Sequence, residues 1–261
     1  MSNPEALSVA QLSFSYSNHP VLRDINFSVN KGEYVSIIGP NGSGKSTLLK
    51  CLNRIVSVDS SAVKILGREL SSFTQKELAK VIGYVPQHQG EIMSFTVDEF
   101  VMMGRYPYLD PFKTYSREDR KIVDDILALT NLGPLKNRYV HQLSGGERQK
   151  VFIASSLAQQ PKILLLDEPT IHLDPHHNIE IQKLISQICC EYQMTILHVT
   201  HDLTHIERWS QKLIALQGGE IVFCGMPAEI LTLENLERVF QTPFQFFSDL
   251  ESRQKIIVPK V

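Results

Sequence analysis

A glycine-rich run at residues 39–47 restricts the fold of this chain more than any other feature of its sequence. The run is Gly39-Pro40-Asn41-Gly42-Ser43-Gly44-Lys45-Ser46-Thr47, and it directly follows the apolar segment 34–38. Residues 45–55 have helical apolar spacing, so a strand, a loop and a helix are predicted in that order. The glycines leave backbone N–H groups free to point into the loop, and the helix adds about half a positive charge at its N-terminus. The run therefore predicts a phosphate-binding loop in an α/β fold.

The side chains that close this loop have separate predicted roles. Lys45 would reach the β- and γ-phosphates of a nucleoside triphosphate, and Ser46 would ligate Mg²⁺. Thr47 would add a hydrogen-bond donor nearer the α-phosphate. Because a strand and a helix are predicted on either side, we prefer this interpretation to its alternative, a glycine-rich turn without a ligand.

The composition limits what surrounds the loop. At 261 residues, with 43% hydrophobic and 21% charged residues, the chain can bury a full core but is short for two large domains. Its 26 basic and 28 acidic side chains are interspersed and give a net charge of −2. We expect one globular unit with subdomains, and no nucleic acid as the main partner.

The N-terminus and the cysteines indicate a reducing, cytosolic location. Residues 1–5 lack the basic start and apolar stretch of a signal peptide, and apolar runs such as 163–166 are too short to span a bilayer. The cysteines have no metal-ligand or redox spacing, and they are Cys51, Cys189, Cys190 and Cys224. We expect all to be reduced, with one thiol of the adjacent pair buried and the other facing elsewhere.

Strand-like segments open the chain and helices follow. Residues 7–14 and 25–29 predict an antiparallel sheet. From Pro86 to about Gln160 the periodicity becomes helical, which predicts an inserted helical region. Its helices are expected at 97–103 and 116–132, the latter with a capping box from Ser116 to Asp119 and a stop at Gly133-Pro134.

A parallel sheet is predicted to resume after the helical region. Residues 162–167 and 194–200 have the pattern of buried strands, separated by a helix that Asp174 caps and Pro175 starts. Near the C-terminus, Gly218-Gly219 between two apolar segments predicts a hairpin turn, with strands at 212–217 and 220–224.

Two adjacent carboxylates end the first of these strands. Asp167 and Glu168 follow four apolar residues, at the edge where ligands of parallel sheets bind. Asp167 would hold Mg²⁺ through water, and Glu168 would act on the attacking water as a general base or orienting group. The alternative for this short pattern alone is an ordinary strand end.

A second glycine-rich turn opens a helix far downstream. Its sequence is Leu143-Ser144-Gly145-Gly146-Glu147-Arg148-Gln149. Ser144 as the cap and Glu147 three residues later form the pattern of a capping box, and such a helix start presents hydroxyl and N–H groups to an anion.

Four motifs in order carry a family resemblance: the phosphate loop, Leu143 to Glu147, the apolar-Asp-Glu-Pro segment, and Val199-Thr200-His201-Asp202. The chain resembles the ATP-binding subunit of an ABC transporter, from about Leu7 to Phe240. The resemblance implies a P-loop NTPase fold with a RecA-like parallel-sheet core, an N-terminal antiparallel β subdomain and an inserted helical subdomain. The expected bounds are 7–86 and 161–240 for the core, 87–160 for the helical subdomain and 241–261 for a C-terminal tail.

The resemblance assigns roles to three further residues. Tyr16 matches the aromatic residue that stacks on adenine, with a strand-packing tyrosine as the alternative. Gln87 matches the glutamine that touches Mg²⁺ or the nucleophilic water and senses the membrane partner, with an exposed loop amide as the alternative. His201 matches the histidine that contacts the γ-phosphate. We interpret the other histidines, including His172, His176 and His177, as ordinary surface or loop residues.

The resemblance also implies a dimer. Two chains would enclose two ATP molecules head to tail, with the phosphate loop of one chain facing the second glycine-rich turn of the other. The ATP-contacting residues of that turn would be Ser144, Gly145, Gly146 and Gln149. Asp174 matches the short loop that couples the two sites, and its alternative is the helix cap already described.

One segment narrows the subfamily. Met103 to Tyr108 resembles the Gly-Arg-Tyr-Pro stretch of import ATPases for iron-siderophore, haem and cobalamin permeases, and its alternative is a helix stop followed by a turn. Two departures weaken the subfamily match: no glycine precedes the strand in 60–67, and Ser155-Ser156 stands where Ala-Arg is common.

The sequence therefore predicts the ATPase subunit of a metal-chelate importer on the cytoplasmic face of the membrane. Its partners would be a second copy of itself, two permease chains and, indirectly, an external binding protein. The permease would dock near Gln87 and residues 97–108. The alternatives are a soluble ABC ATPase of iron-sulfur cluster assembly, which the Gly-Arg-Tyr-Pro stretch disfavours, and an exporter. Translation and DNA-repair ABC proteins, with tandem cassettes or a long coiled coil, and small-molecule kinases, which share only the first loop, fit less well.

Overall fold

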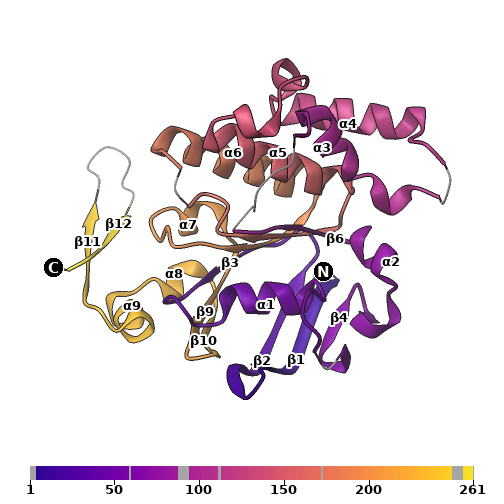
Figure 1. The fold of residues 1–261 in the computed structure, drawn as a ribbon. Coiled ribbons are helices and arrows are strands. Elements are labelled where there is room, and N and C mark those ends of the chain that lie inside the picture. The colour runs from indigo at the N-terminus through magenta and orange to yellow at the C-terminus, as the bar shows by residue number, and fades with distance from the viewer. Residues whose placement is uncertain are drawn as a thin grey trace. The chain divides into compact units, whose positions relative to one another are not determined.

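The computed structural model describes residues 4–58, 60–87, 94–110, 113–171, 173–248 and 255–260 (Figure 1). These residues form two compact units. The first unit comprises Met1–Ser72 and Thr195–Val261, and the second comprises Phe73–Met194. The domain bounds expected from the sequence stay a prediction.

The first unit contains the predicted antiparallel sheet. Strand β1 (Glu5–Tyr16) pairs antiparallel with β2 (His19–Asn30) and with β4 (Val63–Ile65), and β5 (Arg68–Glu69) completes the order β2-β1-β4-β5. Buried side chains alternate with exposed ones along β2, because one face of the sheet covers a core. Two short 3₁₀ helices, η1 (Ser60–Ala62) and η2 (Leu70–Ser72), flank β4 and β5.

A second set of strands in this unit carries the phosphate loop. Strand β3 (Tyr34–Ile38) is buried along its whole length and lies between the parallel strands β8 (Thr195–Val199) and β9 (Lys212–Gln217). The predicted hairpin is confirmed, because β10 (Glu220–Gly225) returns antiparallel to β9 after Gly218 and Gly219, which both have positive φ. Helix α1 (Lys45–Leu52) is shorter than the predicted 45–55, since Arg54 adopts a left-handed φ of 53°.

For the C-terminal end of this unit the sequence predicted only a tail at 241–261, without elements of its own. Helices α7 (Ile206–Trp209), α8 (Pro227–Ile230) and α9 (Leu233–Phe240) precede a hairpin of β11 (Phe244–Ser248) and β12 (Lys255–Pro259). Phe244 and Ile257, one from each strand, join a core with Ile230, Leu236 and Val239. The hairpin is therefore anchored by apolar burial next to α9 (Figure 1).

The second unit pairs two parallel strands with a layer of helices. Strand β6 (Ile82–Val85) runs parallel to β7 (Ile163–Asp167). Figure 1 shows the neighbouring helices α3 (Val97–Met103), α4 (Arg117–Leu129), α5 (Gly145–Ala158) and α6 (Pro175–Tyr192). The remaining elements are short: α2 (Gln75–Ala79), η3 (Tyr106–Tyr108), η4 (Gly133–Leu135) and η5 (Val140–Gln142).

The predicted helix starts of this unit are confirmed by their caps. Ser116 and Ser144 each form a complete capping box, and the Asp174 side chain accepts two backbone N–H groups at the start of α6. The predicted end of α4 was wrong by three residues, 129 in place of 132. The Thr130 hydroxyl donates to the Ile126 carbonyl oxygen at 2.7 Å and Asn131 has a φ of 56°, so the helix stops before Gly133-Pro134.

The cysteine expectation for the adjacent pair is confirmed. Cys189 is buried and Cys190 is exposed, and all four cysteines are free thiols. Within the described ranges, no helix is long and apolar enough to cross a membrane.

Candidate nucleotide site

The phosphate loop has a backbone that requires glycine. Gly39, Gly42 and Gly44 have φ of 149°, 77° and 102°, which L side chains adopt only with strain. A Cβ on Gly39 would also lie 2.1 Å from the carbonyl oxygen of Leu216, and one on Gly44 would lie 2.7 Å from the Leu22 side chain. The loop is therefore a tight turn packed against the strands behind it.

The loop fits the triphosphate that the sequence predicts. Helix α1 begins at Lys45, and among the described residues no side chain caps its first turn at Gly44. The Ser43 hydroxyl is buried and has no hydrogen-bond partner in the described part of the chain. An uncapped helix start and a buried hydroxyl beside a glycine nest are features that a phosphate group satisfies.

Lys45 supplies the positive charge of the loop. Its side chain is buried, and its ammonium donates to the carbonyl oxygens of Gly39 at 2.9 Å and Pro40 at 3.0 Å. The lysine thus bends back over the loop that precedes it. A cation held in this position lies within the loop where phosphates would be cradled.

The second unit brings the predicted base and the predicted glutamine together. Strands β6 and β7 are parallel with Val85 opposite Leu166, so residues two positions farther along each strand emerge at the same edge. There the Gln87 amide donates to Glu168 Oε2 at 2.6 Å. Two site residues predicted from separate motifs are therefore in direct contact.

The two carboxylates at this edge have different surroundings. Asp167 is buried and accepts a hydrogen bond from the Tyr84 hydroxyl at 3.2 Å. Glu168 is also buried, and its φ of 50° places its backbone in the left-handed region. For a residue other than glycine this conformation costs on the order of 1–3 kcal/mol, and such strain concentrates at functional sites. Asp167 and Gln87 carry oxygen atoms of the kind that Mg²⁺ prefers, as does Ser46 in the first unit.

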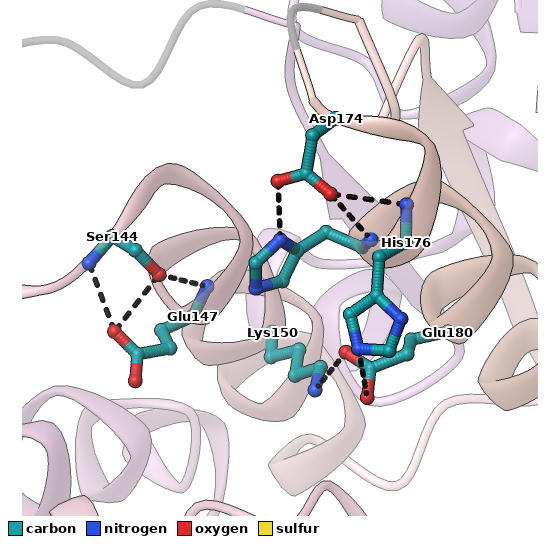
Figure 2. Close-up of polar contacts among 7 residues, drawn as sticks. Ser144, Glu147, Lys150, Asp174, His176 and Glu180 are labelled. Atoms are coloured by element: carbon teal, nitrogen blue, oxygen red, sulfur yellow. Dashed lines mark hydrogen bonds and ion pairs between the residues drawn. The ribbon is translucent and has the colours of Figure 1, made fainter.

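The start of α5 is closed by its own side chains. The Ser144 N–H and hydroxyl both donate to Glu147 Oε2 at 2.9 Å, and Ser144 Oγ accepts from the Glu147 N–H at 3.3 Å (Figure 2). The Ser144 N–H and then its hydroxyl lower the pKa of Glu147, so this carboxylate stays ionised at neutral pH. Gln149 is buried one turn into the helix.

Tyr16 and His201 lie at the surface of the first unit. Tyr16 is 44% exposed, and its ring meets Phe14 edge to face at 4.8 Å between centroids. The residue therefore packs within the sheet and is also partly exposed to solvent. His201 is exposed in the turn that follows β8. Their contacts with a nucleotide stay predictions.

The Gly-Arg-Tyr-Pro segment is fixed by contacts of the buried Arg105. Arg105 is 4% exposed, and it donates to Asp119 at 2.8 Å and to the Ala158 carbonyl oxygen at 2.7 Å while its guanidinium stacks on Tyr108. A Cβ on Gly104 would lie 2.2 Å from the carbonyl oxygen of Ser155. Helix α3 stops at Met103 and the segment continues into the 3₁₀ helix η3, which presents Tyr106 with 72% of its surface exposed.

The sequence analysis missed one residue near the predicted site. His177 was interpreted as an ordinary surface histidine, but Asp174 Oδ2 lies 2.6 Å from its Nδ1 and its ring contacts the backbone of Gly146. His176 is exposed as expected, and His172 lies outside the described residues. The one sign of the Asp174–His177 pair in the sequence is that the two residues are three positions apart, about one turn at the start of a predicted helix.

Comparison with known proteins identifies the family. The model described as "ABC transporter" matches residues 22–171. The chain belongs to that family. The iron(3+)-hydroxamate import ATP-binding protein FhuC of Bacillus subtilis is 38% identical over 96% of this chain and 93% of its own length.

Solved structures agree with this assignment. A structure described as a metal-chelate type ABC transporter in an inward-facing conformation has a TM-score of 0.86 and 30% identity, covering 98% of both chains. The ATP-binding cassette MJ0796, described as a dimer in a post-hydrolysis state with ADP and Pi, has a TM-score of 0.73 and 30% identity over 85% of this chain and 98% of its own. The predicted fold class is confirmed, and the chain is an ABC ATPase.

Proposed function

We propose that this chain is the ATP-hydrolysing subunit of an ABC importer that takes up a metal chelate such as an iron-siderophore, haem or cobalamin. The phosphate loop carries the proposal, because its glycines with positive φ, its helix start without a side-chain cap and its buried Lys45 form a cradle for a triphosphate. The substrate class is supported by relatives such as FhuC, whose name gives iron(3+)-hydroxamate import, over nearly the whole chain.

In the proposed reaction, the loop from Gly39 to Thr47 holds the phosphates and Tyr16 stacks on adenine. Ser46, Asp167 and Gln87 would hold Mg²⁺, which neutralises phosphate charge when bound. Glu168 accepts a proton from water as the water oxygen bonds to the γ-phosphorus and the bond to the β,γ-bridging oxygen breaks. His201 would donate a hydrogen bond to a γ-phosphate oxygen and so hold the γ-phosphate in place for the attacking water.

The proposed working form is a head-to-tail dimer. The ATP held by one chain would meet Ser144, Gly145, Gly146 and Gln149 of the partner, so that ATP closes the dimer and hydrolysis reopens it. ATP shifts this equilibrium only by its preference for the closed state.

We further propose that the dimer works at the cytoplasmic face of the membrane beneath two permease chains, with an external binding protein delivering the chelate. The exposed Tyr106, which directly follows the buried Arg105, supports the region 97–108 as the permease contact. Copurification of the chain with a permease, and ATPase stimulation by the chelate-loaded binding protein, would test this.

Glu168→Gln tests the hydrolytic assignment. The amide cannot accept the proton, so turnover should fall by about 10²–10⁴-fold while ATP binding persists and a dimer accumulates. ATPase assays, nucleotide titration and size-exclusion chromatography with ATP measure these effects. The control is Glu118→Gln, an exposed glutamate on α4. If Glu168→Gln hydrolysed ATP at the wild-type rate, Glu168 would not be the base.

A further inference from the structure

Two helices that follow functional loops begin side by side in the second unit. Helix α5 begins directly after Ser144, and α6 begins directly after Asp174 (Figure 2). Lys150 on α5 donates to Glu180 on α6 at 2.9 Å. One turn closer to the helix starts, the His177 ring lies against Gly146. We call these two contacts the α5–α6 clasp.

The contact between His177 and Gly146 leaves no space for a side chain. A Cβ on Gly146 would lie 2.2 Å from His177 Cδ2 and 2.4 Å from Cγ. Gly146 has an ordinary helical backbone, so its φ does not require glycine. The histidine ring therefore supplies the reason for glycine at this position within a single chain.

The same ring is fixed on its other side by Asp174. Asp174 Oδ2 lies 2.6 Å from His177 Nδ1, and Oδ1 accepts the N–H groups of His176 and His177 at 3.0 and 3.1 Å. The hydrogen bond from the His177 side chain is the main cause of the lowered pKa of Asp174, so the carboxylate accepts and Nδ1 donates. The imidazole is held between the cap of α6 and the first turn of α5.

The two contacts of the clasp differ in stiffness. Lys150 and Glu180 are long side chains in a partly exposed ion pair, with 14% and 38% of their surfaces accessible, and such pairs constrain geometry weakly. His177 is a rigid ring in contact with backbone, and 27% of its side chain is exposed. A shift of Asp174 would therefore reach α5 mainly through His177.

We propose that His177 is a positioning residue that links the Asp174 loop to the Ser144-Gly145-Gly146 helix start of the same chain. Asp174 follows Glu168 after a short loop, so a change at the hydrolytic end of β7 is passed through His177 to the surface that would bind the partner's nucleotide. The effect on turnover rests on the proposed function, whereas the contact itself does not.

Adjacent histidines provide a matched pair for the activity test. His177→Ala should lower kcat by about tenfold and reduce the cooperativity of hydrolysis with ATP concentration, while ATP affinity of the phosphate loop stays unchanged. His176→Ala removes a side chain that is 78% exposed and should leave kcat within about twofold of wild type. Wild-type kcat and cooperativity in His177→Ala would overturn the proposal.

His177→Asn separates the ring contact from the helix cap. An asparagine amide can donate to Asp174 as Nδ1 does, but it is too short to replace the ring against Gly146. We expect this variant to melt near the wild-type temperature and to show the same loss of kcat as His177→Ala. If a folded His177→Asn protein were fully active, the hydrogen bond to Asp174 would be the whole role of His177. That result would overturn the positioning role.

A double-mutant cycle tests the contact without an activity readout. Gly146→Ala should lower the melting temperature because the new methyl group overlaps the ring, and adding His177→Ala should recover part of that loss. Additive losses would show that the ring does not occupy this space. If the wild-type protein did not hydrolyse ATP while the cycle was non-additive, the proposed function would be refuted. The contact between His177 and Gly146 would still stand.

Discussion

Two helices of this chain, α1 and α5, start at glycine-rich segments. The two starts differ in whether a side chain caps the first backbone N–H groups of the helix. The first has three glycines with positive φ, and among the described residues it has no side-chain cap. The second has ordinary helical glycines and a complete capping box of Ser144 and Glu147. A side chain thus caps the start of α5, whereas among the described residues none caps the start of α1.

This difference explains why similar sequences suit different tasks. The start of α1 has no side-chain cap among the described residues, so a phosphate can take the place of one in a single chain. The closed start of α5 is stable without a ligand, and the Ser144 hydroxyl must exchange its bond to Glu147 for one to an anion. We therefore expect α1 to set ATP affinity and α5 to act only once the partner's nucleotide arrives.

The largest expected effect separates the two starts by ATP affinity. Lys45→Ala should weaken ATP binding by about 10- to 100-fold, because the phosphates lose a charge-assisted hydrogen bond. Ser144→Ala should leave ATP affinity of the isolated chain unchanged and lower only its ATPase rate. Direct titration with a nucleotide measures both. Undiminished affinity in Lys45→Ala would count against the phosphate loop.

An effect on stability, of similar size in free energy, separates the glycines of the two starts. Gly39→Ala combines a φ of 149° with a contact 2.1 Å from Leu216, and it should cost about 3 kcal/mol of unfolding free energy. Among the described residues, the methyl group of Gly145→Ala meets only Leu173, at 3.6 Å, and the change should be neutral or stabilise the helix by up to about 1 kcal/mol. Urea unfolding compares them, and equal losses would contradict the described difference.

The capping box of α5 should depend on pH. The pKa of Glu147 is lowered in the folded chain, so its stabilisation is present above its unfolded pKa and is lost as pH falls through the folded pKa. Ser144→Ala should cost about 1 kcal/mol at pH 7, and this difference should shrink below pH 4.5, the ordinary value for glutamate. Unfolding curves at several pH values test this, and a constant difference would show that Glu147 takes no part.

The smallest effect concerns the interior of α1. Burial raises the pKa of Cys51 to about 12 and that of Cys189 to about 11. Cys190 and Cys224 are exposed, and partial burial also raises the pKa of Cys224. A thiol reagent at pH 8 should label Cys190 and Cys224 in the folded protein and reach the other two only after unfolding. Rapid labelling of Cys51 would show that the helix behind the phosphate loop opens easily.

Local signals predicted local structure well. The bounds of β3 and α3, the caps at Ser144 and Asp174 and the turn at Gly218-Gly219 depend on neighbouring residues, and the sequence analysis found each of them. Motifs likewise named Gln87 and Glu168 as site residues. Their 2.6 Å contact depends on the pairing of β6 with β7, which sequence spacing does not reveal.

Contacts between distant elements were the features that sequence could not predict. His177 meets Gly146 only because α5 and α6 begin side by side, and no periodicity marks that approach. The hairpin of β11 and β12 was missed because its anchoring residues, Phe244 and Ile257, need α8 and α9 to be buried against.

The hydrogen bond between Gln87 and Glu168 bears on how fast the chain hydrolyses ATP when no permease is bound. A cassette that is made without its permease gains nothing by hydrolysing ATP. The Gln87 amide donates to Glu168 Oε2, which stabilises the charged carboxylate and makes that oxygen a weaker base toward water. A permease that drew Gln87 away would restore the basicity of this oxygen, so ATP hydrolysis should be faster in the assembled transporter than in the isolated chain.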